Sequence, residues 1–129
     1  MSTHSEISAT PLAGGVPCDR PDAAAYHRRW LLIDEDGNWI ADADLLRAIR
    51  VDVRFGHLVL KAEGMLRLDF PLEVIEDDDS VFMSATVGAG TVQVVDEGEV
   101  AATWMGKLLG RPARLVKLYP ADQAVDWPA

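Results

Sequence analysis

The sequence predicts a mainly β fold, an antiparallel β-barrel-like meander of hairpins with one amphipathic α-helix packed on it. Short apolar segments, several alternating with polar residues, follow one another from about residue 27 to residue 95. Turns with glycine separate many of them, and one stretch with helical spacing follows at 97–109. A chain of 129 residues suits one domain, which we place at 7–119 between a flexible N-terminus at 1–6 and a C-terminal tail at 120–129.

The first hairpin is predicted around Asp36-Gly37, which lies between two apolar arms. An Asp-Gly pair in this setting is a strong signal for a two-residue type I′ turn. The opposed pairs would be Ile33 with Ile40 and Leu32 with Ala41.

A second hairpin is predicted from segments 51–55 and 58–62, with Gly56-His57 as its loop. The opposed pairs in this register are Phe55 with Leu58, Val53 with Leu60, and Asp52 with Lys61. One face of the hairpin is then apolar, and the other carries an opposite-charge pair.

The remaining strands follow from alternation and from turn residues. Segment 66–70 alternates strictly and should pair so that Leu60 lies opposite Leu68 and Leu58 opposite Phe70. Pro71 marks an edge or a bend, because proline has no N–H to give to a sheet. Further strands are expected at 72–75, 81–87, 91–95 and 114–119, and a short helical turn around Leu45-Leu46.

The helix at 97–109 has recognisable ends. Asp96 is the expected N-cap, Glu99 completes a capping box, and Val95 with Val100 forms a hydrophobic staple. Gly110 and Pro112 end the helix. The apolar stripe expected to face the sheet is Val100, Ala101, Trp104, Met105 and Leu108.

The charge balance argues against two classes of partner. Twelve Lys and Arg against twenty-one Asp and Glu give a formal net charge of −9 at pH 7. Such a surface repels phosphate backbones and anionic lipids, so we expect neither nucleic acid nor a membrane as partner. The lone Cys18 cannot form an intramolecular disulfide, and no signal peptide is readable. We therefore expect an acidic, cytoplasmic protein.

No metal site is predicted. Residues 34–38 carry clustered oxygen ligands, but Gly37 is misplaced for a calcium loop and a hairpin turn explains the segment. The acids at 77–79 are interpreted as a solvated turn. A zinc site needs ligands at short paired spacings. No two of Cys18 and the histidines His4, His27 and His57 lie within five residues of each other.

Cys18 is the candidate nucleophile, with His27 or His57 as base. An activated thiolate needs a helix N-terminus or neighbouring cations. Cys18 instead follows Pro17 and precedes Asp19, although Arg20 is near. A role as a small loop or core residue is favoured over a thiol enzyme, and no catalytic residue is predicted.

The candidate ligand-binding residues are Arg28, Arg29 and Trp30. On a strand, Arg28 and Trp30 share one face, where a cation beside an aromatic ring suits an anionic ligand. The alternative is structural: Arg28 and Arg29 pair with some of the many acids, or stack on Trp30.

The order of the motifs from residue 7 to residue 119 resembles the N-terminal β-barrel domain of MOSC proteins, the family of molybdenum cofactor sulfurases and amidoxime-reducing enzymes. The motifs that carry the resemblance are the segment 28–34, then Asp36-Gly37, then Asp96-Glu97-Gly98 with Ala101, Ala102 and Trp104, and finally Leu109-Gly110 and the segment 114–116.

The resemblance implies a non-catalytic domain, because the family's chemistry resides in a following MOSC domain. In the reducing enzymes a Lys-Ser pair on the first loop and an arginine hold the cofactor's phosphate. Arg28 matches that arginine, whereas Val16 and Pro17 occupy the Lys-Ser positions and His27 replaces an aspartate. We expect a stand-alone accessory module for a MOSC-domain or molybdenum cofactor protein, with no cofactor bound. The alternative is a module that binds an anionic ligand or molybdopterin.

Overall fold

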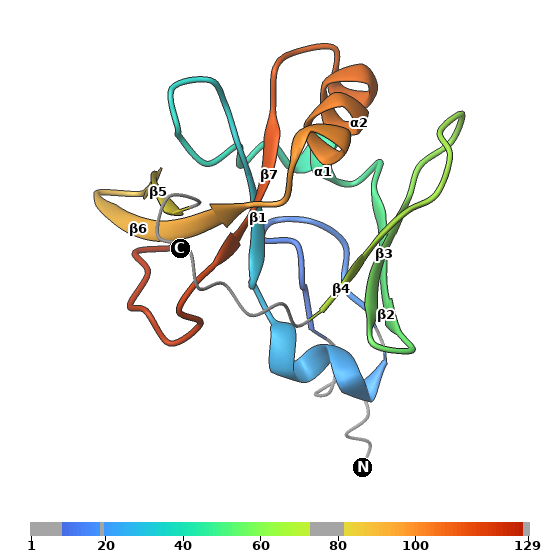
Figure 1. The fold of residues 1–129 in the computed structure, drawn as a ribbon, viewed down its shortest axis with the longest axis horizontal. Helices are drawn as coiled ribbons and strands as arrows, with labels where there is room; N and C mark the ends of the chain where they lie inside the picture. The colour runs from blue at the N-terminus through green and yellow to red at the C-terminus, as the bar shows by residue number, and fades with distance from the viewer. Residues whose placement is uncertain (1–8, 19, 73–81, 128–129) are drawn as a thin grey trace. The chain divides into compact units, whose positions relative to one another are not determined.

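The computed structural model describes residues 9–18, 20–72 and 82–127, and the chain divides into two compact units. The first unit comprises Met1–Arg29 and Ala41–Ile75, and the second comprises Trp30–Ile40 and Glu76–Ala129. The fold is mainly antiparallel β, as predicted, but its described strands form two open sheets rather than a closed barrel (Figure 1).

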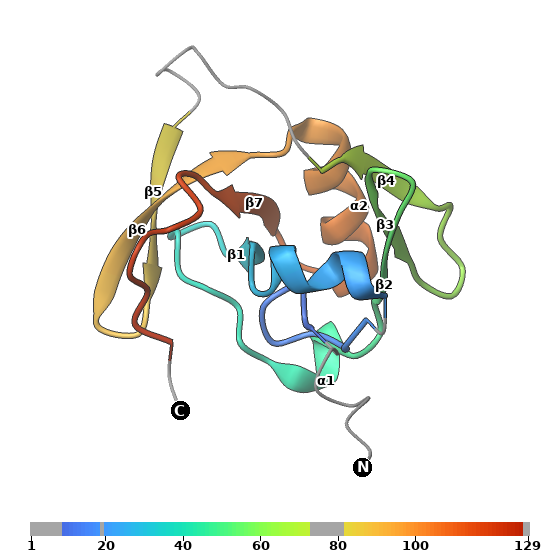
Figure 2. The ribbon, with the colours of Figure 1, turned by 90° about the horizontal axis from the view of Figure 1, so that it is seen from below.

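The first unit contains a three-stranded sheet in the order β2-β3-β4, drawn in green in Figures 1 and 2. Its strands are β2 (Arg50–Arg54), β3 (His57–Lys61) and β4 (Leu68–Pro71). The predicted pairs of Leu60 with Leu68 and Leu58 with Phe70 are confirmed. Pro71 is the last residue of the edge strand β4, a position where the missing N–H of proline interrupts no hydrogen bonding within the sheet interior.

Two short helices precede this sheet. The 3-10 helix η2 (Pro21–Tyr26) starts at a proline, and α1 (Ala43–Leu46) confirms the helical turn expected around Leu45-Leu46. Asp42 caps α1, because its carboxylate accepts the N–H groups of Asp44 at 3.0 Å and Leu45 at 3.4 Å.

The loop of the β2–β3 hairpin differs from the prediction by one residue. Arg54 lies opposite His57, so the two loop residues are Phe55-Gly56 rather than Gly56-His57. Both have positive φ, 53° and 75°, as a type I′ turn requires, and glycine takes its second position. The pairing moves by two residues, to Val53 opposite Leu58, which leaves the apolar face unchanged but brings Arg50 opposite Lys61.

The second unit contains a four-stranded sheet in the order β1-β7-β6-β5 (Figure 1). Its elements are β1 (Trp30–Ile33), β5 (Phe82–Val87), β6 (Gly90–Asp96), α2 (Glu99–Leu109) and β7 (Arg114–Leu118). The sheet is not a simple meander, because β1 pairs with β7, the last strand. All four residues of β1 are buried, which an isolated hairpin would not achieve.

The predicted two-residue turn at Asp36-Gly37 is wrong by one residue. The loop has three residues, because the N–H of Asp34 donates to the carbonyl of Asn38 and Ile33 lies opposite Trp39. The Asp34 carboxylate accepts the N–H groups of Asp36 and Asn38, which closes the turn. Gly37 has φ of 82°, the left-handed position of such a loop.

The N-terminus of α2 also differs from the prediction. Asp96 ends β6, and Gly98 is the N-cap without a side-chain hydrogen bond. The Asp96 carboxylate accepts the Gly98 N–H instead, and Val100 is 74% exposed, so the hydrophobic staple is absent. Ala101, Trp104 and Met105 form the buried face, and Gly110 ends the helix in the left-handed conformation, as predicted.

The segment after β7 folds back onto the β5–β6 hairpin of its own unit. The side chain of Gln123 bonds to the backbone of Gln93, and Asp126 accepts the N–H of Ala89. The predicted strand at 72–75 beyond Leu72, and the acids at 77–79, lie outside the described residues. Within the described ranges, the helices are too short or too polar to span a bilayer.

The backbone at Phe55 yields a stability prediction. A left-handed conformation costs a side chain with Cβ about 1 to 2 kcal/mol, whereas asparagine adopts it readily. We expect Phe55→Asn to raise the free energy of unfolding by about 0.5 to 1 kcal/mol, because the lost contact with Arg54 offsets part of the gain. Urea unfolding of Phe55→Ala, which keeps the strain, should give no gain; an equal gain for both variants would contradict the backbone explanation.

Candidate functional site

Arg28 lies beside the first loop of the first unit. The N–H of Arg28 donates to the carbonyl of Thr10 at 2.8 Å, and the N–H of Thr10 donates to His27 Nδ1 at 2.9 Å. Ala9 and Cys18 pair as a β-bridge that closes the loop at its base. These bonds hold the backbone of Arg28, an exposed residue, next to the first loop.

Arg28 also has a strained backbone, with φ of 55°. Among the described non-glycine residues, only Arg28 and Phe55 have positive φ. Glycine or asparagine would occupy this conformation at lower cost, so a functional requirement is one explanation for an arginine there.

Arg29 and Trp30 do not continue one strand face with Arg28. β1 begins at Trp30, after the left-handed residue, so the alternation assumed from the sequence does not extend back to Arg28. Arg29 is half-buried, and the boundary between the two units falls immediately after it. A binding role for Arg28, Arg29 and Trp30 stays a prediction.

Trp30 belongs to the core of the second unit. Its ring is fully buried, and its Nε1 donates to the carboxylate of Glu97 at 2.6 Å. Lys117, 2% exposed and opposite Trp30 in the β1–β7 register, places its Nζ 5.9 Å from the ring centroid. A buried ammonium near an aromatic face is a stabilising cation–π contact.

Cys18 is buried, as the sequence analysis favoured. Its Sγ lies 3.7 Å from the carboxylate of Asp52, which accepts the thiol hydrogen and also pairs with Arg20 Nε at 3.0 Å. A nearby cleft is lined by Pro17, Pro21 and Val51 in addition to these side chains. The Asp52 carboxylate therefore joins the first loop to β2 as a structural link.

Metal binding has no geometric support in the described part of the chain. No three His, Cys, Asp or Glu side chains among those residues are grouped to hold an ion. In the segment 34–38, the Asp34 carboxylate is occupied by two backbone N–H groups of its own turn.

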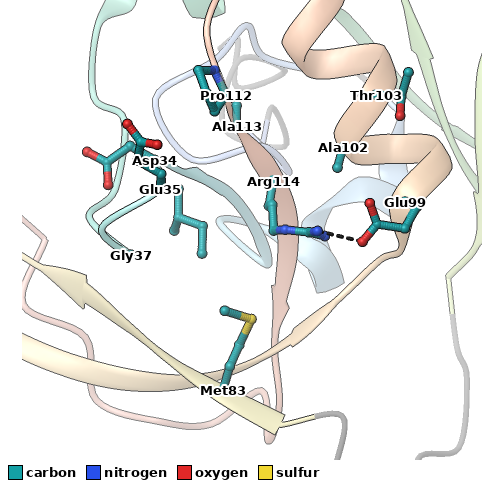
Figure 3. Close-up of a pocket in the computed structure, with 11 residues that line it drawn as sticks. Asp34, Glu35, Gly37, Met83, Glu99, Ala102, Thr103, Pro112, Ala113 and Arg114 are labelled. Carbon is teal, nitrogen blue, oxygen red and sulfur yellow. Dashed lines mark hydrogen bonds and ion pairs between the residues drawn. The ribbon is translucent and has the colours of Figure 1, made fainter.

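The second unit contains a cavity of about 470 Å³ that the sequence analysis did not identify. Figure 3 shows Arg114 of β7 extending toward Glu99 of α2, with Met83 of β5 on another wall and Asp34 and Glu35 on the side opposite α2. The rest of the wall is mostly small and apolar, from Ile33, Ala102, Pro112 and Ala113.

Two carboxylates hold the guanidinium of Arg114. Nη1 pairs with Asp96 at 2.6 Å and Nη2 with Glu99 at 2.5 Å. The hydrogen bond to Glu99 and the charge of Asp96 raise the pKa of Arg114 above its ordinary value. This arginine keeps its charge at any working pH, and two acids already neutralise it, so the cavity offers little attraction to an anion.

The two acids of this cluster were noticed in the sequence but were assigned a different role. Asp96 and Glu99 at three-residue spacing indicated a capping box, the ordinary interpretation of that pattern. Arg114 lies on a different strand, and only the β6–β7 pairing brings it to the two acids.

Comparison with known proteins places the chain in a family. The solution structure of a protein from Bordetella bronchiseptica is 46% identical, matches 100% of this chain and 98% of that one, and has a TM-score of 0.81. The chain belongs to the same family as this Bordetella protein. No protein-family model matches the chain.

A more distant similarity reaches curated enzymes. Molybdenum cofactor sulfurases of Bos taurus and Homo sapiens are each 29% identical over 96 residues, which are 71% of this chain and 11% of those proteins. The Danio rerio enzyme is 27% identical over 106 residues, 78% of this chain and 13% of its own length. The chain thus spans about a tenth of the length of these relatives. Most of the chain is similar to one region of molybdenum cofactor sulfurase.

The bond between Trp30 and Glu97 yields a prediction. Trp30→Phe removes a donor to a charged acceptor, and we expect a loss of about 1.5 to 3 kcal/mol in the free energy of unfolding. The double variant Trp30→Phe/Glu97→Leu has no carboxylate that lacks this donor. Its free energy of unfolding should therefore be partly restored relative to Trp30→Phe. Denaturant unfolding of the two variants and of Glu97→Leu measures the coupling; additive effects would show that the bond contributes nothing.

The Arg114 cluster yields a second prediction. Asp96 is 23% exposed and also accepts the Gly98 N–H, whereas Glu99 is 81% exposed. We expect Asp96→Ala to lower the free energy of unfolding by about 1 to 2 kcal/mol and Glu99→Ala by less than about 0.5 kcal/mol. Thermal unfolding of the two variants gives the comparison, and equal losses would contradict the ranking.

Proposed function

We propose that this protein is a non-catalytic accessory module that binds a MOSC-domain protein of molybdenum cofactor metabolism. The observation that carries the proposal is the similarity to one region of molybdenum cofactor sulfurase over 96 residues. The motifs quoted from the sequence fall on β1, α2 and β7 and on the turns beside them. In this proposal the region corresponds to the domain that precedes the MOSC domain in that family.

The first loop supports a partner role over a cofactor role. Val16 and Pro17, which match the phosphate-binding Lys-Ser pair of the resemblance, have apolar side chains, and Pro17 also lacks an N–H. His27, in place of the aspartate, is held by Thr10. Arg28 alone remains of the phosphate-binding set, so these residues do not fit the cofactor's phosphate and we assign no step to the cofactor.

Anion binding at Arg28 is the second candidate function. The observation that favours it is the strained backbone of an exposed arginine beside a loop. A single guanidinium can bind a phosphate or carboxylate group in bidentate fashion, although without further donors the affinity should be low.

One substitution separates the two candidates. Arg28→Gly removes the guanidinium and keeps the positive φ without strain, so the fold should persist. Calorimetric titration with a MOSC-domain protein of the same organism should give a one-to-one complex with a Kd of about 10 µM or tighter for both the wild type and Arg28→Gly. Titration with pyrophosphate should leave the amide signals of residues 10–18 unchanged.

Other outcomes reject the proposal. Absence of a complex with the MOSC-domain protein would remove the accessory role. Pyrophosphate shifts that are present in the wild type, lost in Arg28→Gly and kept in Arg29→Gln would instead establish the anion-binding module.

A further inference from the structure

The cations of this acidic chain are concentrated in the first unit. That unit contains eight Lys and Arg against nine Asp and Glu, whereas the second unit contains four against twelve. The net charge of −9 therefore resides almost wholly in the second unit. A local surface of the first unit can be positive even though the protein as a whole is negative.

The outer face of the β2-β3-β4 sheet carries that positive charge. Val51 and Val53 point into the core, so Arg50 and Arg54 lie on the opposite face of β2 with Asp52 between them. Lys61 of β3 and Arg67 before β4 add to this face, and a cleft of about 450 Å³ is lined by Arg54, Phe55, His57, Val59, Lys61, Arg67 and Asp69. We call the four side chains Arg50, Arg54, Lys61 and Arg67 the cationic face.

Two of its cations are arranged at a cost to stability. Arg50 and Lys61 lie directly opposite each other across β2 and β3, and like charges in that position repel. Arg54 pairs with Asp52 at 3.5 Å and Arg67 with Asp69 at 3.3 Å, but neither Arg50 nor Lys61 forms an ion pair with a described residue. Both side chains are exposed and available to an external anion.

The loop of the same hairpin presents an aromatic ring to solvent. Phe55 is 86% exposed, and the Arg54 guanidinium lies 5.3 Å from the centroid of its ring. The turn holds Phe55 in the left-handed conformation, where asparagine would be cheaper. An exposed phenylalanine kept at a strained position indicates a role for the ring outside the fold.

We propose that the cationic face binds an acidic segment of a partner protein, with carboxylates on Arg50 and Lys61 and an apolar side chain on Phe55. Phe55 follows Arg50 by five positions, about 16 Å of extended backbone, so one extended segment of five or six residues reaches both. A peptide fits better than a nucleic acid, because Asp52 and Asp69 interrupt the face and the acidic second unit repels a long polyanion.

This inference goes beyond the proposed function, since it concerns the chemistry of a surface and not the identity of the partner. A MOSC-domain protein can bind elsewhere on the chain, and an acidic segment can belong to another protein. Failure of the peptide experiment below leaves the titration with the MOSC-domain protein unaffected, and the reverse also holds.

The test uses the full chain and a ten-residue peptide with three glutamates at one end, a phenylalanine at the other, and serine and glycine between them. We expect amide shifts at residues 50–61 and 67–69, and an affinity that falls as NaCl rises from about 0.05 M to about 0.5 M. The double variant Arg50→Gln/Lys61→Gln should bind about five- to tenfold more weakly, the effect of losing two exposed ion pairs.

The matched control removes two exposed cations from the second unit. Lys107→Gln/Arg111→Gln has the same net charge as the test variant and should bind the peptide as the wild type does. Phe55→Asn should bind the peptide a few-fold more weakly than the wild type, with the same dependence on NaCl. A peptide in which the three glutamates are replaced by glutamines should bind neither the wild type nor any variant.

Three results would overturn the proposal. Equally weakened peptide binding in the two double variants would show that only the net charge of the protein matters. Tighter binding of a ten-nucleotide single strand than of the peptide would assign the face to nucleic acid. Concentration-dependent self-association that disappears in Arg50→Gln/Lys61→Gln, measured by sedimentation, would make a second copy of this chain the occupant.

Discussion

The antiparallel pairing of β1 with β7 is the contact on which the second unit depends. It joins residues more than eighty positions apart in the chain, from Ile33 with Arg114 to Trp30 with Lys117. A contact of such sequence separation carries a large entropic cost, because a long loop must close to form it. Once formed, it buries all of β1, brings Trp30 beside Lys117, and sets Arg114 at the wall of the cavity (Figure 3).

Local patterns predicted the elements better than they predicted their partners. Alternation and glycine positions located β2, β3, β4 and the end of α2, because these features depend on neighbouring residues. The pairing of β1 could not be obtained in that way. The local pattern indicated only the hairpin of β1 with residues 38–40, which the structure contains in a shifted register, and nothing in residues 30–33 indicates that β7 pairs with β1 as well. The predicted positions of the turns at Gly37 and Gly56 were wrong by one residue. Glycine indicates a left-handed residue, but it does not determine which position of the loop that residue occupies.

The candidate site residues show the same difference between what local sequence predicts and what depends on distant strand pairing. Arg28 was found from its neighbourhood and is exposed beside the first loop, whereas Trp30 is a core residue whose burial follows from the distant β7. The Arg114 cluster and the cationic face both require cross-strand register, which no single segment of the sequence contains. Phe55 could have been noticed, because phenylalanine before glycine at a hairpin loop is an unusual choice for a residue with positive φ.

The course of the chain through its two units has a consequence for how the protein can vary. The backbone leaves the first unit after Arg29, supplies β1 to the second, returns at Ala41 and crosses again after Ile75. Neither unit is an uninterrupted stretch of polypeptide. A gene break at any one of these crossings would separate β1 from β7 or divide the first unit. Recombination at a single crossing therefore cannot replace one unit and leave the other intact.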